Sequence, residues 1–386
     1  MKKAQVYIVF AIVALAMCAS LYGVLAFKMQ VTYELQYSIE ISGKGNFTIN
    51  IPIPPKLSWQ KTLSANVSVV KGEGKVSYNL DKGYIRIFSR NYVKYDAKVN
   101  TLVTGTYSSR DILRKLNITL DEYLAEVKGD LGENYTKLVS PTYWWNYSDP
   151  RFETFLKDFL SEYNITSVEE LKNFKLSKVV SMIRQYVARK LNYTPISGGR
   201  QNIFEALNKS LGDCSEYSDA FVVFSRYIGI PTLRCIGYVA NEWNSKLKEY
   251  DIMGHAWPII YVSGVGWMPY EVTVGPGYLK GSPGDVSPKY ICLVVDKGAK
   301  SMEYLDLKRE VIYDPEEHWV PGSSSAVHID DLTVTVEITV KPKPQIEIHE
   351  EIQANGLSIL VMLFPIITTV TLSLAIMVTV GAFREH

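Results

Sequence analysis

The chain has 386 residues, which is long enough for two domains and additional segments. Its formal net charge at pH 7 is +1, and no basic patch is interleaved with aromatic residues, so nothing in the charge argues for a nucleic-acid or strongly acidic partner. The 4 cysteines and 5 histidines show no metal-ligand spacing, so we expect no metal and no cofactor.

The N-terminus carries an uncharged apolar run from Ala4 to about Phe27, preceded by two lysines. A run of this length can span a bilayer, and the lysines favour a cytoplasmic start. We therefore expect residues 1–27 to be a transmembrane anchor or, with cleavage near Ala26, a signal segment.

Residues 28–107 have the alternation of apolar and polar residues that is typical of β-strands. The pattern runs from Val31 to Ile41, resumes from Phe47 to Ile53, and is followed by further short alternating stretches. Short strands separated by turn residues predict a small β-sandwich. It contains no catalytic constellation, and we expect it to be a spacer or a binding module.

From residue 108 to 191 the pattern changes to that of helices. The expected helices are Ser109–Leu116, Leu120–Val127, Phe152–Tyr163 and Ser177–Leu191. The last has an apolar stripe that includes Val180, Ile183 and Val187, which predicts core packing. Between them, Trp144 or Trp145 could donate an indole N–H to an oxyanion, and packing is the alternative.

Cys214 follows the turn-forming pair Gly212-Asp213 and precedes an apolar, helix-like run that stops at Gly229. The sequence therefore predicts a cysteine at a helix N-terminus. The free N–H groups and the helix dipole there favour the thiolate, which is the nucleophilic form.

A histidine and a carboxylate follow in chain order. His255 opens a strand-like segment that extends to Val262, and Glu271 ends the next one, after Trp267-Met268. Two neighbouring antiparallel strands would place His255 beside Glu271. The carboxylate would then orient the imidazole, and the imidazole would take the proton of the thiol. The alternatives are a buried structural cysteine and a structural histidine.

These residues resemble the core of the transglutaminase-like superfamily, a circularly rearranged relative of the papain-like cysteine proteases. The resemblance is carried by Gly212–Glu216, Phe224–Arg234, Gly237-Tyr238, Gly254–Trp257 and Trp267–Thr273. It implies an α+β fold over residues 108–320, in which the cysteine-bearing helix packs on an antiparallel sheet that bears the histidine and the acid. It also implies that Cys214 is the nucleophile and His255 the base. The family mostly has Asp at the position of Glu271, so the extra methylene is a departure.

The remaining cysteines have several readings. Cys235 and Cys292 lie in apolar, strand-like runs, and they could form a disulfide or remain two buried thiols. The polar and charged stretch Asn241–Asp251, which precedes His255, is expected to be a loop near the acceptor side.

Toward the C-terminus, residues 321–355 are expected to form a β-strand and a stalk, because Leu332–Val340 alternates cleanly before the breaker Lys341–Pro344. Residues 356–383 are predicted to be a transmembrane helix, since Leu357–Ala382 is apolar and uncharged.

The two apolar ends predict a protein of the cell membrane. If the first run is retained, both termini are cytoplasmic and the main domain is extracytoplasmic. Sequons of the form Asn-X-Ser/Thr support an outside location, because they are more frequent than composition predicts. They are Asn46, Asn66, Asn117, Asn134, Asn146, Asn164, Asn192 and Asn208.

The expected function is that of a membrane-anchored, extracytoplasmic transglutaminase-like cysteine enzyme. It would transfer or hydrolyse the acyl group of an amide in a surface protein or peptide through a thioester on Cys214. Its partners would be the lipid bilayer and that protein or peptide, with no nucleic acid. The alternative is an inactive surface module that keeps the fold for binding or structure.

Overall fold

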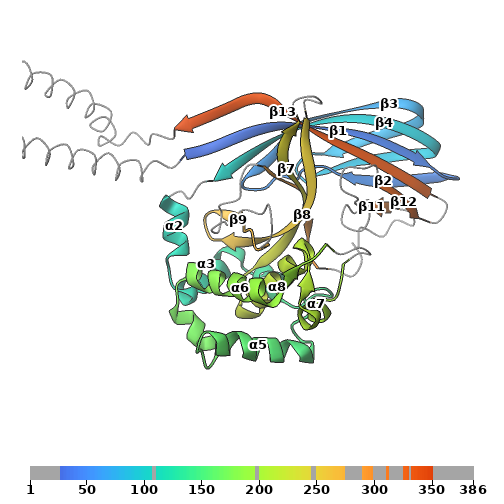
Figure 1. Cartoon of the computed structure of the whole chain (residues 1–386). Coiled ribbons are helices and arrows are strands. Elements are labelled where there is room, and N and C mark those ends of the chain that lie inside the picture. The colour runs from blue at the N-terminus through green and yellow to red at the C-terminus, as the bar shows by residue number, and fades with distance from the viewer. Residues whose placement is uncertain are drawn as a thin grey trace, which may run out of the picture. The chain divides into compact units, whose positions relative to one another are not determined.

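The computed structural model describes residues 27–106, 110–195, 200–244, 249–273, 289–298, 310–312, 325–329 and 332–350 (Figure 1). Residues 28–348 form one compact unit. No helix in the described ranges is long and apolar enough to cross a membrane. The predicted membrane helix at 356–383 lies outside the described residues, as does nearly all of the predicted N-terminal segment 1–27.

The larger sheet of the unit has seven strands, in the order β11-β2-β4-β1-β13-β12, with β3 paired to β4. The strands are β1 (Phe27–Ser42), β2 (Asn46–Pro52), β3 (Gln60–Asn79), β4 (Tyr84–Thr106), β11 (Glu310–Ile312), β12 (Ser325–Ile329) and β13 (Leu332–Glu350). The alternation that predicted β1 is confirmed, because Tyr33, Leu35, Tyr37 and Ile39 are all buried on one face.

This sheet takes in strands from outside the expected small sandwich at 28–107. The strand expected at Leu332–Val340 forms as part of β13, but β13 continues through Lys341–Pro344, where a break was expected, to Glu350. Three of its strands come from residues 310–350, and β13 pairs beside β1. Alternation within a segment shows that a strand forms, but it does not show which strand becomes its neighbour. The apolar face of β13, with Val334, Val336 and Val340 buried, joins the core of the N-terminal strands.

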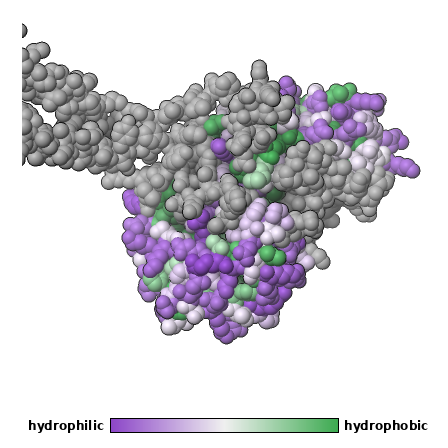
Figure 2. Space-filling view, viewed as in Figure 1, coloured by the Kyte–Doolittle hydropathy of each residue, from purple (hydrophilic) through white to green (hydrophobic). Residues whose placement is uncertain are grey.

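The helices follow in one block. They are α2 (Arg110–Leu116), α3 (Leu120–Leu131), α4 (Asn134–Val139), α5 (Pro150–Glu162), the 3₁₀ helix η1 (Val168–Asn173), α6 (Leu176–Lys190), α7 (Ile203–Lys209) and α8 (Cys214–Ile228). The predicted stripe of α6 is confirmed, because Val180, Ile183 and Val187 are fully buried. The short α4, η1 and α7 were not predicted. In Figure 2 the surface over the helices is mostly hydrophilic, with isolated apolar side chains.

A second sheet of four strands lies against α8. Its order is β10-β7-β8-β9, all antiparallel, with β7 (Thr232–Asn244), β8 (Glu249–Val262), β9 (Gly266–Pro269) and β10 (Tyr290–Asp296). Helix α8 packs on β7 and β8. The predicted α+β class, with the cysteine-bearing helix on an antiparallel sheet, is therefore confirmed. A two-stranded parallel sheet, β5 (Asn192–Tyr193) with β6 (Leu211–Gly212), leads into α8.

The expected loop at 241–251 is wrong. Strand β7 extends to Asn244 and β8 begins at Glu249, and residues 242–244 pair with residues 249–251; residues 245–248 lie outside the described ranges. The polar composition of the segment indicated a loop, but a long hairpin can extend beyond its sheet with solvent on its faces.

At the edge strand β10, a side-chain amide makes the hydrogen bonds that a neighbouring strand would make. Gln60, at the start of β3, donates from Nε2 to the Cys292 carbonyl at 2.8 Å, and its Oε1 accepts from the Cys292 N–H at 3.0 Å. The amide therefore takes the place of a strand partner at the register shift of β10.

Candidate active site

The N-terminus of α8 places Cys214 in its first turn. Asp213 is the N-cap, and its carboxylate accepts a hydrogen bond from the Ser215 N–H at 2.9 Å. The Glu216 carboxylate accepts from the Asp213 N–H at 2.9 Å, which completes a capping box. Cys214 is half-buried directly after this cap, where the N–H groups of the first turn favour a thiolate.

Glu216 is buried one turn into the same helix. Burial and the nearby charge of Asp213 raise the pKa of Glu216 to about 8. At pH 7 this carboxyl is therefore mostly protonated, and it adds little negative charge beside Cys214.

Strand β8 carries His255 opposite Gly237 of β7. The imidazole is buried and stacks on Trp257, with ring centroids 5.8 Å apart and planes at 22°. The β8 backbone and the indole together fix the orientation of the ring.

Glu271 lies just after β9, which ends at Pro269, and β9 pairs antiparallel with β8. The Glu271 Oε2 is 2.7 Å from His255 Nε2. The neighbouring-strand geometry expected from the sequence therefore brings these two side chains together, although Glu271 itself is outside the strand.

The Glu271 carboxylate has further donors. Its Oε1 accepts from the Thr273 N–H at 2.7 Å, and its Oε2 accepts from the Tyr290 hydroxyl at 2.7 Å. Burial raises the pKa of Glu271, but the charge of His255 and these hydrogen bonds outweigh burial and lower it below its usual value. The carboxylate is therefore ionised at neutral pH.

Cys214 lies close enough to His255 for its side chain to raise the pKa of the imidazole. Burial lowers the pKa of His255, but the charge of Glu271 and the side-chain interactions with Cys214 and Glu271 outweigh it and raise the pKa to about 10. The arrangement supports an imidazolium held beside the Glu271 carboxylate.

Sequence reasoning missed three contacts of this site. Tyr290 is the first residue of β10, Thr273 contributes only its backbone, and Arg184 of α6 donates from Nε to the Glu271 carbonyl at 3.0 Å. The position of Arg184 off the apolar stripe of α6 was the one available signal. Nothing in the sequence linked Tyr290 to Glu271.

The indole of Trp145 lies in a buried ion-pair network instead of pointing at a substrate. Its Nε1 donates to Asp219 Oδ1 of α8 at 2.7 Å, and the side chain is fully buried. Arg200 and Arg234 bridge Asp219 to Asp296 of β10. The N···O distances are 2.6 Å for Arg200–Asp219, 2.9 Å for Arg200–Asp296, 2.7 Å for Arg234–Asp296 and 3.4 Å for Arg234–Asp219.

We predict that Trp145→Phe lowers stability without changing the chemistry. The variant leaves the buried Asp219 with one donor fewer, which should cost about 1–3 kcal/mol of unfolding free energy. Denaturant unfolding measures this loss, and acylation of Cys214 by p-nitrophenyl acetate measures the chemistry, because that reaction forms an oxyanion. A large drop in acylation of folded Trp145→Phe would show instead that this indole donates to the oxyanion. Trp144→Phe is measured in the same way to test the other indole.

The other predicted sites fall on the surface or in the core. All eight sequon asparagines are exposed, and their glycosylation remains a prediction. Cys235 and Cys292 are buried, unbridged thiols, and the Cys292 thiol donates to the Val294 carbonyl at 3.3 Å. In the described part of the chain, no group of His, Cys, Asp and Glu is placed to hold a metal ion.

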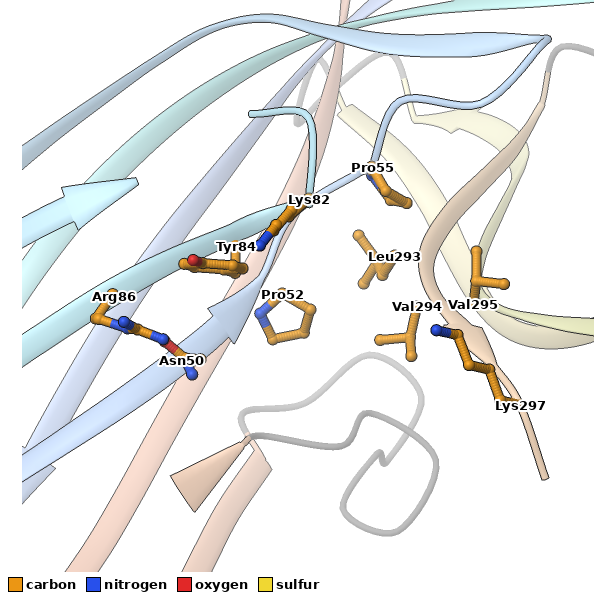
Figure 3. A pocket seen from close by; sticks show the side chains of 11 residues that line it. Asn50, Pro52, Pro55, Lys82, Tyr84, Arg86, Leu293, Val294, Val295 and Lys297 are labelled. Carbon is orange, nitrogen blue, oxygen red and sulfur yellow. The ribbon is translucent and has the colours of Figure 1, made fainter. Parts of the chain in front are cut away.

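A separate pocket of about 450 Å³ lies between strands β2 and β4 on one side and β10 on the other (Figure 3). Lys82, Arg86 and Lys297 line it together with the apolar Leu293 and Val294. None of its lining residues is Cys214, His255 or Glu271.

Comparison with known proteins finds one family model that covers the site. Residues 167–272 match the model of the transglutaminase-like superfamily. No curated protein matches the chain. Among solved structures, a "putative cysteine protease" from Cytophaga hutchinsonii has a TM-score of 0.48 and 13% identity over 84% of this chain and 95% of its own. The periplasmic domain of TgpA from Pseudomonas aeruginosa, bound to ethylmercury, has a TM-score of 0.29 and 14% identity over 61% of this chain and 88% of its own.

Proposed function

We propose that this chain, whose residues 167–272 form a transglutaminase-like core, is a cysteine enzyme that transfers or hydrolyses the acyl group of an amide. The observation that carries the proposal is the buried pair of His255 Nε2 and Glu271 Oε2 at 2.7 Å, together with the closeness of Cys214 to His255 and the place of Cys214 in the first turn of α8.

The reaction would proceed in two steps. The thiolate of Cys214 attacks the amide carbonyl, and the backbone N–H of Cys214 helps to hold the oxyanion. His255 gives its proton to the leaving amine, the C–N bond breaks, and a thioester remains on Cys214. An acceptor then gives a proton to the neutral His255 and attacks the thioester, the C–S bond breaks, and Cys214 leaves as the thiolate beside the restored imidazolium. Water as the acceptor gives hydrolysis, and an amine gives a new amide.

The raised pKa of His255 matters for the first step. With a pKa of about 10, the imidazole stays protonated across neutral pH and can act as the general acid toward the amine. Glu271 holds that charge in place and remains ionised beside it.

The substrate class follows from location, which is also part of the proposal. The apolar ends of the chain and the eight exposed sequon asparagines favour a membrane-anchored protein with its core outside the cytoplasm, so the substrates would be surface proteins or peptides. Protease added to intact cells should then digest the core. Protection of the core in intact cells, and digestion only after lysis, would refute this location.

The chemistry is tested by alkylation of Cys214 with iodoacetamide across pH 5 to 9, followed by mass spectrometry of the full-length protein. We expect fast labelling. Its rate should reach half of the maximum at a pH below about 8.5, which is the pKa of an ordinary thiol. Cys214→Ser should abolish the labelled peptide, and His255→Ala should slow the reaction. Labelling at an ordinary thiol's rate and midpoint, unchanged in His255→Ala, would favour the inactive binding module.

A further inference from the structure

Tyr290 lies outside the stretch that matches the family, yet its hydroxyl is 2.7 Å from Glu271 Oε2. We propose that Tyr290 is a positioning residue, whose hydroxyl fixes the Glu271 carboxylate so that it can orient His255. The inference deepens the proposed function and rests on it, because it concerns the same site.

The side chain of Glu271 needs more than one contact to be fixed. A glutamate carboxylate is separated from the backbone by two methylene groups, so a single bond to His255 leaves its end free to rotate. Thr273 N–H holds Oε1, while Tyr290 and His255 share Oε2. With donors on both oxygens, the plane of the carboxylate is set, and so is the direction from which it meets the imidazole.

Tyr290 is itself held rigidly. It is the first residue of β10, pairs opposite Val239 of β7 and is buried. Its ring meets the Trp257 ring edge-on, at 5.3 Å and 87°, and the His255 ring at 5.6 Å and 65°. One side chain therefore contacts the base through its ring and the acid through its hydroxyl.

The hydroxyl acts as a donor at every pH of interest. Burial and then the charge of Glu271 raise the pKa of Tyr290 far above its usual value, so the phenol stays protonated beside the carboxylate. The groups that face Glu271 from each neighbouring element are His255 of β8, Tyr290 of β10 and, at its backbone carbonyl, Arg184 of α6. Among the described residues, two side chains therefore meet this carboxylate: the base His255 and Tyr290.

The test is a double-mutant cycle on the full-length protein, with iodoacetamide as the probe and Cys214 labelling as the readout. Tyr290→Phe keeps the ring packing and removes only the hydroxyl. We expect it to slow labelling at pH 7 by about tenfold and to raise the pH at which labelling is half-maximal. The reason is that a mobile Glu271 carboxylate stabilises the His255 imidazolium less, and the imidazolium then favours the Cys214 thiolate less. In a Glu271→Gln background, Tyr290→Phe should add almost nothing.

Tyr186→Phe is the matched control. Tyr186 is another buried tyrosine whose hydroxyl donates to a carboxylate, that of Asp158 at 2.9 Å. Its hydroxyl also meets the Phe155 carbonyl, and its ring packs on Phe159 and Phe224, all away from the site. Its variant should label like the parent, and circular dichroism confirms that each variant is folded. To cover a folding defect in Tyr290→Phe, the same readout is taken for Glu271→Asp, whose shortened carboxylate withdraws from the hydroxyl while Tyr290 is kept.

Two results would overturn the inference. One is a Tyr290→Phe variant with the parent's rate and pH midpoint. The other is an equal loss of labelling rate when Tyr290→Phe is made in the parent and in the Glu271→Gln variant, because such a loss would come from packing alone. Failure of the proposed function looks different, because His255→Ala would then label as fast as the parent whatever the behaviour of Tyr290.

Discussion

Replacing Glu271 with alanine should slow labelling of Cys214 at pH 7 by about a hundredfold or more. The substitution removes the charge that most strongly raises the pKa of His255 and leaves Thr273 N–H and the Tyr290 hydroxyl without their acceptor. The imidazole would then be mostly neutral at neutral pH and free of its orienting contact. Site-resolved mass spectrometry of alkylated Cys214 measures the effect.

Two further substitutions separate the effect of the charge at this position from the effect of side-chain length. Glu271→Gln keeps the length and loses the charge, so the pKa of His255 should fall and reactivity should drop nearly as far as in the alanine variant. Glu271→Asp keeps the charge but is one methylene shorter, so it cannot meet all three donors, and we expect about a tenfold loss. Equal reactivity of the Asp, Gln and Ala variants with the parent would remove Glu271 from the mechanism.

The largest effect on stability should come from Arg234→Met. Arg234 is fully buried, donates to Asp296 at 2.7 Å and lies 3.4 Å from Asp219. Its removal leaves two buried carboxylates to the single remaining cation, Arg200, within this network. Breaking a buried ion pair on one side costs about 3–5 kcal/mol, and we expect a loss of that size in the unfolding free energy.

The control for this prediction is Lys157→Met, which breaks the exposed pair with Glu153 on α5. That pair is solvated, and we expect no measurable change in the denaturant midpoint. An Arg234→Met variant with the parent's midpoint would show that the network does not hold α8 against β7 and β10.

The site could be predicted from the sequence where its residues lie in recognisable local patterns. The cap at Asp213, the apolar run after Cys214 and the alternation around His255 each follow from short-range rules, and the structure brings Cys214, His255 and Glu271 together as those rules suggested. What they do in catalysis remains the proposal above.

What the sequence did not predict depends on distant partners. Tyr290 meets Glu271 only because β10 pairs with β7, and the strands at 310–350 join β1 only through long-range pairing. The ion-pair network combines four side chains from three elements and a connecting segment, none of which has a distinguishing local pattern. Local propensity cannot reveal such contacts, since each residue alone is ordinary.

The pairing of β13 beside β1 has a consequence for synthesis. About 290 residues separate Ser42, at the end of β1, from Leu332, at the start of β13. At about 5–20 residues per second, the ribosome needs roughly 15–60 seconds to supply the missing neighbour. During that time a long, half-apolar strand has β4 on one side and an open edge on the other. A chain that stops before Leu332 would keep this edge open permanently and should aggregate faster on release than the complete chain; equal aggregation would show that another segment covers β1 first.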